Sequence, residues 1–224
     1  DAGRTIATRL SARLADGNGG TDTQAIAVTV TNVNEAPVIT SGAAVSAAEN
    51  QTAVTTVASS DVDGGTPIYS IIGGADAALF SIDSATGVLT FNSAPDFEAP
   101  SDNGGNNVYD VTVRVVDGNG GTDTQALAVT ITNVNEAPVI TSNGGGATAG
   151  VSVAENQTAV TTVASRDVDG GTPTYSIVGG ADAALFTIDS ATGVLTFNAA
   201  PNYEAPADAG DNNVYDVIVQ VADG

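Results

Sequence analysis

The sequence predicts an all-β fold, built from antiparallel β-sandwiches arranged in series. Two observations lead to this prediction: the chain repeats itself, and each period divides into short β-branched segments of alternating polarity. Residues 152–198 nearly copy residues 46–92 at an offset of 106 positions. A repeat of this length is a whole domain and not one turn of a solenoid.

Within one period the candidate strands are short and follow one another through turn sequences. They cover residues 25–33, 53–59, 67–72, 87–92 and 108–117. The Asp- and Gly-rich segments between them favour turns with positive φ. The stretch TDTQALAVTIT, residues 122–132, follows DGNGG and is predicted to close a hairpin with residues 108–117. Roughly seven short strands in about 100 residues are typical of an antiparallel sandwich.

The repeat boundaries predict three segments. Residues 1–36 are the last two strands and the linker of a preceding repeat, or a donor-strand segment. Residues 37–137 are one complete repeat, and residues 138–224 are a second repeat without its final strand. The first 17 residues resemble residues 208–224 at both ends but differ in the middle. Apolar residues still alternate with polar ones at Leu10, Ala12 and Leu14, so we expect a strand in this stretch.

The composition is strongly acidic and narrows the possible partners. There are 26 acidic and 5 basic residues, all five of them arginine, for a formal net charge of −21. Such a surface repels nucleic acid and anionic membranes and attracts cations. The sequence contains no run of 18 apolar residues, so no membrane-spanning helix is predicted. No secretion signal opens the sequence, so we expect one to have been removed or to lie elsewhere in a larger precursor.

The residue types also argue against an enzyme. The chain contains no His, Cys or Lys, so the usual general bases, nucleophiles and Schiff-base formers are missing. The acidic pairs that remain recur in both repeats. We therefore predict no catalytic residues and no organic cofactor.

Carboxylate and amide side chains gather at turns and strand ends in each period. Carboxylates at positions i and i+2 of extended backbone project to one side, where they repel each other without a counter-ion. Ca²⁺ takes six to eight oxygen ligands of this kind, whereas Mg²⁺ demands stricter geometry. Without His or Cys, zinc and other transition metals are disfavoured. The clusters are AEN (Glu49, Glu155), DVD (Asp61, Asp63, Asp167, Asp169), DFE and NYE (Asp96, Glu98, Asn202, Glu204), DG (Asp16, Asp117, Asp223) and NVNE (Asn32, Asn34, Glu35, Asn133, Asn135, Glu136).

The motifs in their order resemble the cadherin repeat, in the form found in large bacterial surface adhesins. The resemblance is carried by AEN, DVDGGTPIYSI, FSIDSATGVLTF, PDFE, YDVTVRVVDGNGG and NVNEAP, which together span essentially the whole chain. It implies tandem Greek-key, immunoglobulin-like β-sandwiches joined by linkers that bind Ca²⁺. In this family the ions lie between successive repeats and stiffen the chain into a rod.

The resemblance also assigns ligands, with about three ions at a complete junction. The junction after the full repeat would use Glu49, Asp96 and Glu98, then Asn133, Asn135 and Glu136 of the linker, and finally Asp167, Asp169 and Asp223. The junction before it would use Asn32, Asn34 and Glu35 with Asp61, Asp63 and Asp117. At the far end of the last repeat Glu155 and Glu204 would serve.

Two departures from the family pattern predict weaker sites. The linker opens with Asn133 where the family has Asp, and it closes early at Ala137 and Pro138. In the last repeat Asn202 replaces the Asp of the paired acids. Each change removes one carboxylate. The loop 101–109, SDNGGNNVY, is expected to be a solvated loop, with an ion or ligand site as the alternative.

Two functions remain open, both extracellular or at the cell surface. In the first, the chain is part of a calcium-stiffened stalk that projects an adhesin from the cell, with neighbouring repeats as partners and an unknown surface or matrix ligand. In the second, it is a self-polymerising fibre subunit. The spare strand in residues 21–33 of one copy would then complete the last repeat of another. Glu155 and Glu204 would meet Asn34, Glu35, Asp61 and Asp63 of that copy.

Overall fold

The computed structural model describes residues 6–15 and 18–223, and the predicted all-β class is confirmed. The chain divides into two compact units, residues 1–134 and 135–224. The described residues form β-strands and three short 3₁₀ helices, η1 (Ala77–Leu79), η2 (Ser142–Gly144) and η3 (Ala183–Leu185).

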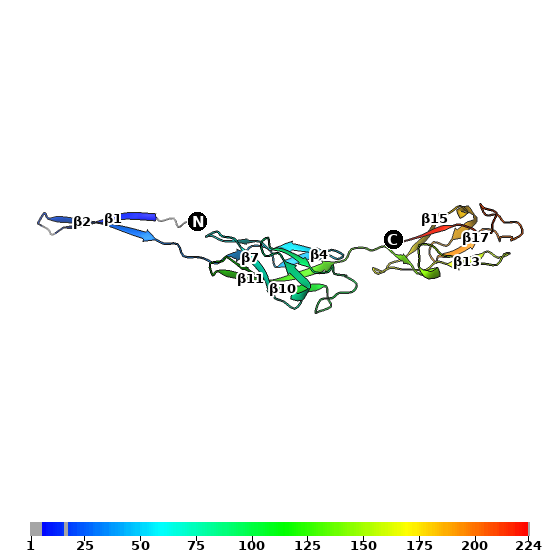
Figure 1. Cartoon of the computed structure of the whole chain (residues 1–224), viewed down its shortest axis with the longest axis horizontal. Coiled ribbons are helices and arrows are strands. Elements are labelled where there is room, and N and C mark those ends of the chain that lie inside the picture. The colour runs from blue at the N-terminus through cyan, green and yellow to red at the C-terminus, as the bar shows by residue number, and fades with distance from the viewer. Residues whose placement is uncertain (1–5, 16–17, 224) are drawn as a thin grey trace. The chain divides into compact units, whose positions relative to one another are not determined.

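The first unit opens with a two-stranded hairpin (Figure 1). Strand β1 (Ile6–Ala15) pairs antiparallel with β2 (Thr21–Val30), so the strand expected in the divergent N-terminal stretch is present. Among the described residues, neither strand of the hairpin pairs with a third strand. All side chains of β2 are exposed. The described side chains of the hairpin therefore form no core.

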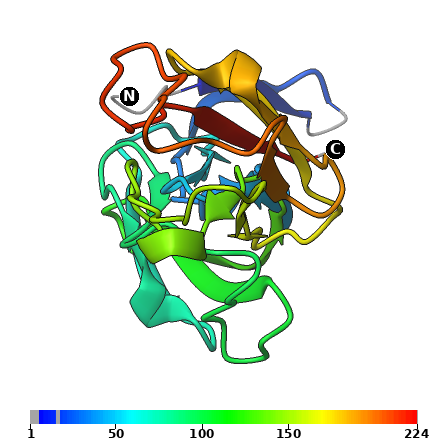
Figure 2. The same cartoon turned by 90° about the vertical axis from the view of Figure 1, so that its right-hand side faces the viewer.

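A sandwich follows the hairpin in the first unit. One sheet has the order β4-β11-β10-β7 and another has the order β5-β9-β8, with a short β3-β6 pair beside them. Figure 2 shows these strands, cyan to green, in a second orientation. The strands are β3 (Val38–Ile39), β4 (Ala44–Ala48), β5 (Ala53–Thr56), β6 (Ser59–Ser60), β7 (Ile68–Gly73), β8 (Phe80–Ile82), β9 (Val88–Phe91), β10 (Val108–Val116) and β11 (Thr122–Thr132).

The predicted hairpin of β10 and β11 is confirmed, with Val111 opposite Leu127. Strand β11 also pairs with β4, and this second pairing is parallel. The single strand predicted over residues 53–59 is instead two strands. Val57 lies between them, 1% exposed, and its N–H donates to the carbonyl of Gly87. This bond extends the pairing of β5 with β9 by one residue, and β6 then pairs with β3 in the separate two-stranded sheet.

The core of the sandwich follows the alternation of β10 and β11. Val111, Val113 and Val115 are at most 1% exposed, and Leu127 and Val129 are at most 2% exposed. An aromatic group fills the space beside them. The rings of Phe80 and Phe91 stack at 4.5 Å, and Tyr109 meets Phe91 edge-on at 5.1 Å. Edge-on and offset contacts are the favoured arrangements of aromatic pairs.

The second unit repeats most of this plan with two-stranded and three-stranded sheets. Their orders are β13-β17-β16, β15-β18 and β12-β14. Phe186, Phe197 and Tyr215 reproduce the aromatic group at the same 4.5 Å and 5.1 Å separations. The strands are β12 (Val139–Ile140), β13 (Ala159–Thr162), β14 (Ser165–Arg166), β15 (Thr174–Gly179), β16 (Phe186–Ile188), β17 (Val194–Phe197) and β18 (Ile218–Ala222).

The two units differ where β11 would lie. Strand β18 pairs only with β15 in the described part of the second unit, whereas its counterpart β10 lies between two partners. Val217 and Val219 are half-buried, while the equivalent Val111 and Val113 are fully buried. Residues 150–154, which correspond to β4, are exposed and form no strand. In the first unit the corresponding side chains and segment pack against β11.

The loop 101–109 is held by a buried carboxylate. Asp102 is 7% exposed, and its oxygens accept the N–H groups of Gly104, Asn106 and Asn107 at 3.0 Å. Burial opposes ionisation, but these N–H bonds outweigh it and keep the pKa of Asp102 below its ordinary value. Asp208 closes the equivalent loop of the second unit in the same way. The loop is therefore an ordered structural element.

We expect Asp102→Asn to lower the free energy of unfolding at pH 7 by about 1–3 kcal/mol, because an N–H donor replaces an acceptor that faces N–H groups. A lowered folded-state pKa gives stability that is present above the unfolded pKa, about 3.9, and lost as the pH falls through the folded value. The difference from the unchanged protein should therefore shrink below about pH 4. Urea unfolding at pH 7 and pH 3 in a chelator measures it.

Asp110→Asn is the matched control, because the Asp110 side chain is exposed on β10. It should change stability by less than about 0.5 kcal/mol. Equal losses for Asp102→Asn and Asp110→Asn would show that the loop does not depend on the buried carboxylate.

Candidate calcium sites

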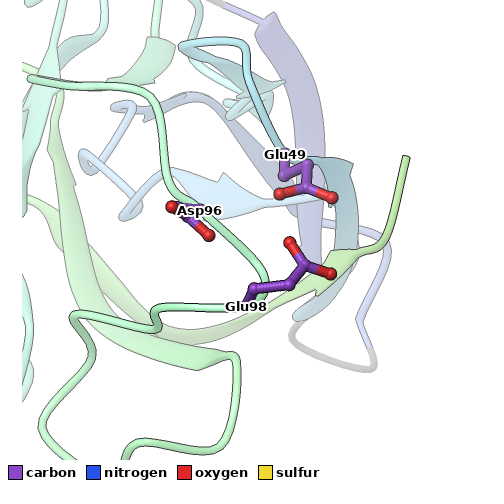
Figure 3. Close-up of side chains that lie close together, drawn as sticks. All are labelled: Glu49, Asp96 and Glu98. Atoms are coloured by element: carbon purple, nitrogen blue, oxygen red, sulfur yellow. The ribbon is translucent and has the colours of Figure 1, made fainter. Parts of the chain in front are cut away.

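Three carboxylates of the first unit meet at one end of its sandwich. Glu49 follows β4, and Asp96 and Glu98 lie on the loop after β9. One oxygen of each lies within 4.8 Å of the others. Figure 3 shows the carboxylates of Glu49 and Glu98 pointing toward one another, with Asp96 beside them. These three residues are among the ligands predicted from the sequence for one junction, and the fold brings them together.

Glu49 is the fixed member of this group. It is 3% exposed, and its two oxygens accept the N–H groups of Phe97 and Val134, each at 2.7 Å. Asp96 is exposed and accepts the N–H of Ala99 at 2.9 Å. Three negative charges this close favour a cation, and their oxygens are the hard donors that Ca²⁺ prefers. The donor set fits calcium on these grounds.

The corresponding group of the second unit is weaker. Glu155, Asn202 and Glu204 are all exposed. Glu155 accepts the N–H of Tyr203 at 3.0 Å, and Asn202 accepts the N–H of Glu204 at 3.0 Å. The group has two carboxylates in place of three. Glu155 is exposed because residues 150–154 before it form no strand.

The first linker meets the acidic turns of the sandwich that follows it. The side-chain amide of Asn32 donates to Asp63 at 2.5 Å, and the N–H of Glu35 donates to Asp63 at 2.6 Å. The amide of Asn34 donates to Asp117 at 2.7 Å. These contacts join the linker and turn residues that the sequence analysis assigned to one junction. Asp16 lies outside the described residues.

Asp61 gives a further indication that a cation fits here. Its Oδ1 accepts the N–H of Asp63 at 2.8 Å, while its Oδ2 is buried and has no hydrogen-bond partner. A buried carboxylate oxygen without a partner is costly unless something positive meets it. A cavity of about 140 Å³ lies beside it, lined by Pro37, Ser59, Asp61, Gly64, Gly65, Pro67 and Asp117.

The pKa values of this cluster reflect crowded carboxylates. A hydrogen bond to Asp63, together with the negative charge of Asp63, raises the pKa of Glu35. The amide of Asn32 lowers the pKa of Asp63, and the amide of Asn34 lowers the pKa of Asp117. Asp63 and Asp117 therefore stay ionised at neutral pH, which is the state that binds a metal ion.

The second linker repeats two of these three contacts in the second unit. The amide of Asn135 donates to Asp223, and the N–H of Glu136 donates to Asp169 at 2.6 Å. Asp167 accepts the N–H of Asp169 at 3.0 Å. Asn133, two residues before Asn135, is exposed at the end of the first unit. All the predicted linker and turn residues of this unit thus lie at its N-terminal end.

One residue of this region was not singled out in the sequence. A Cβ built on Gly121 would lie 2.3 Å from Asp117 Oδ2 and 2.8 Å from the Cα of Ala36. Glycine at this position lets the loop between β10 and β11 approach the first linker and Asp117 closely. The recurring DGNGG sequence could have pointed to Gly121. A turn alone accounts for this motif, however, so the close approach to the linker does not follow from it.

Comparison with known families agrees with this arrangement. The family model described as the cadherin domain matches residues 43–133, which run from β4 to the start of the second linker. Residues 43–133 are therefore similar to a cadherin domain. Cadherin domains in general bind Ca²⁺, in keeping with the acidic groups described above.

Solved cadherin ectodomains share the fold. Human CDH23 EC21-23 is 18% identical with a TM-score of 0.55, and the match covers 95% of this chain and 72% of that one. Human protocadherin-24 EC1-2 is 22% identical with a TM-score of 0.54, covering 85% and 88%. The protocadherin gammaB7 EC3-6 cis-dimer structure is 20% identical with a TM-score of 0.53, covering 98% and 55%.

This chain thus spans about half the length of the protocadherin gammaB7 structure. Comparison with curated protein sequences gives no match. In the part of the chain that the structure describes, no helix has the length and apolar character needed to cross a membrane.

The two units offer a reciprocal test of the calcium assignment. We expect Asp96→Asn to weaken calcium binding by about tenfold, because it removes one charged ligand. Asn202→Asp should strengthen binding at the second unit by a similar factor. Isothermal titration calorimetry of each variant, after removal of calcium, measures both changes.

The control is Asp83→Asn. Asp83 lies in a turn, where it accepts the N–H groups of Ala85 and Thr86, away from the predicted ligands. Its calcium isotherm should match that of the unchanged protein. Unaltered isotherms for both Asp96→Asn and Asn202→Asp would contradict the assignment.

Proposed function

We propose that this chain is a calcium-stiffened extracellular repeat segment, part of the stalk of a cell-surface adhesin. The observation that carries the proposal is the division of the second linker. Val134 donates its N–H to Glu49 in the first unit, while Asn135, the next residue, donates to Asp223 in the second unit. Two consecutive linker residues therefore donate hydrogen bonds to carboxylates of different units.

Calcium would act on this linker by neutralising repulsion. Glu49, Asp96 and Glu98 precede it, and Asp167, Asp169 and Asp223 follow it, all with acidic side chains. Brought together at the linker without a cation, these groups repel one another. A cation shared by several of them removes the repulsion and restricts the linker, so the repeats would hold a defined orientation.

The remaining features support a structural role over a catalytic one. Cadherin domains are adhesion modules and not enzymes. One matched structure is titled as a cis-dimer, which concerns that protocadherin. For this chain we propose neighbouring repeats or other copies as partners, together with a cell-surface or matrix ligand whose identity is open. The acidic surface disfavours nucleic acid and anionic lipid.

Calcium removal and re-addition test the proposal. At a calcium concentration 100 times the dissociation constant, we expect stabilisation by about 2.7 kcal/mol per site, because the ion binds the folded state. Differential scanning calorimetry should show a higher Tm with calcium than with a chelator. Small-angle X-ray scattering on the same samples should show a narrower distribution of maximum dimensions with calcium.

Two controls test whether the response is specific to calcium and to the predicted ligands. Magnesium at the same concentration should give a smaller shift, because these ligands suit the larger ion. The double variant Glu49→Gln, Asp169→Asn should lose most of the calcium response. An unchanged Tm and scattering curve at millimolar calcium would exclude calcium stiffening.

A fibre subunit is the second candidate function, and a specific observation favours it. Strand β2 has nearly the sequence of β11, which lies between two partner strands in the first unit, and all side chains of β2 are exposed. Open strand edges recruit further strands. Because donor and acceptor lie on different surfaces, the contact would not close and would build filaments.

Sedimentation velocity distinguishes the two candidates. A stalk segment should remain monomeric with and without calcium. A fibre subunit should form larger species as its concentration rises.

A further inference from the structure

We propose that the outer face of the sheet β4-β11-β10-β7 in the first unit is a self-association surface. A second copy packs on it about a twofold axis that crosses β10 at Thr112. This proposal rests on the proposed partnership with other copies and adds the surface through which they meet. The contact uses none of the predicted calcium ligands.

The outer side chains of β10 form a row that is complementary to itself. The odd-numbered residues from Tyr109 to Val115 are buried, so the even-numbered residues turn to the outer face. In chain order the outer residues are Val108, Asp110, Thr112, Arg114 and Val116. When a second copy of this row lies antiparallel across the first, each carboxylate faces a guanidinium, and Val108 faces Val116.

The two charges of the row do not pair with each other. Successive residues of a strand advance by about 3.4 Å, so Asp110 and Arg114 are roughly 13 Å apart along β10. Arg114 lies opposite Ser70 on one side and Thr124 on the other, and neither neighbour is charged. Arg114 is also the only basic residue in the sequence between residues 14 and 165. Its exposed guanidinium is therefore available to a carboxylate of another molecule.

The strands beside β10 add a neutral surface. Asp110 lies opposite Ala128, which pairs in turn with Ala44, and these residues line a hollow of about 540 Å³. On the other side of β10, Ile68 and Ile72 of β7 are 49% and 48% exposed. Because the axis crosses the strands, β7 of one copy would lie over β7 of the other. The isoleucines would then cover one another, and the alanines would allow close approach of the sheets.

The second unit lacks this pattern. Strand β18 has Asp216 where β10 has Asp110, but it has Gln220 where β10 has Arg114. Two copies of the second unit in the same arrangement would place each aspartate against a glutamine, without an ion pair. The second unit is therefore an internal control for the role of Arg114.

The size of the face predicts a weak dimer. Four strands about 4.8 Å apart and roughly 25 Å long give a face of roughly 500 Å² in each copy. The total of about 1,000 Å² lies at the low end for specific interfaces, so we expect a dissociation constant of about 0.1–1 mM. The contact is isologous and closes at two copies, unlike a fibre contact. The chain is thus monomeric in dilute solution and pairs when it is concentrated.

Charge reversal combined with crosslinking tests the arrangement. The chain contains no native cysteine, so Thr112→Cys supplies a single thiol near the axis. A short bis-maleimide should join two such chains at about 0.5 mM protein, where a weak dimer is populated. Adding Asp110→Arg or Arg114→Asp places like charges face to face twice in each dimer, and should lower the yield at least about tenfold. Both reversals in one chain, or a mixture of the two single variants, should restore the yield.

Three controls accompany this experiment. Asp110→Arg makes the chain less negative and Arg114→Asp makes it more negative, so an effect of net charge alone would act on them in opposite directions. Asp216→Arg makes the same change of charge on β18 and should leave the yield unchanged. Ala53→Cys, at an exposed position of β5 in the other sheet, should give no dimer in place of Thr112→Cys.

The proposal is overturned if Ala53→Cys crosslinks as well as Thr112→Cys, or if the single reversals have no effect or opposite effects. It is equally overturned if the double reversal does not restore the dimer. Calcium isotherms of the charge variants should match that of the unchanged protein, because neither residue is a predicted ligand. A missing dimer with normal calcium binding would leave the stalk proposal in place, and a dimer without calcium binding would remove only the stalk proposal.

Discussion

The pairing of β11 with a strand on each side is the interaction on which the first unit depends. Through β10 it closes the core, and through β4 it orders the segment that ends at Glu49. Val134, which follows β11, then donates to Glu49. One strand therefore links the apolar core to the position of a calcium ligand. The second unit shows the contrast, since Glu155 is exposed where Glu49 is buried.

Negative charge is the second constraint. The formal charge of −21 includes carboxylates whose oxygens already accept backbone N–H groups, such as Asp102 and Glu49. At Asp102 the backbone N–H groups keep the pKa of the carboxyl below its ordinary value. Asp61 differs, since one of its oxygens is buried without a hydrogen-bond partner. Carboxylates whose oxygens accept backbone N–H groups hold loops, whereas a carboxylate with a buried oxygen that lacks a partner is suited to a cation. Both kinds occur in Asp- and Gly-rich turns.

Much of this structure could be predicted from the sequence, because repetition exposes local patterns twice. The β-class, the β10–β11 hairpin and the strand in residues 6–15 follow from alternation and turn residues. The buried role of Asp102 could not be predicted, because it depends on three N–H groups that converge only in the folded loop. Nor could the loss of strand in residues 150–154. Their sequence resembles that of β4, and only the neighbouring strand distinguishes the two.

The parallel pairing of β4 with β11 has a mechanical consequence for a protein under tension. The chain enters β4 (Ala44–Ala48) from one end of the pair and leaves β11 at Thr132, at the opposite end. Pulling on the two ends of this sandwich would therefore slide the strands along each other, loading their hydrogen bonds together and not one after another. Resistance to force would be set by this short parallel contact, well before the aromatic core is disturbed.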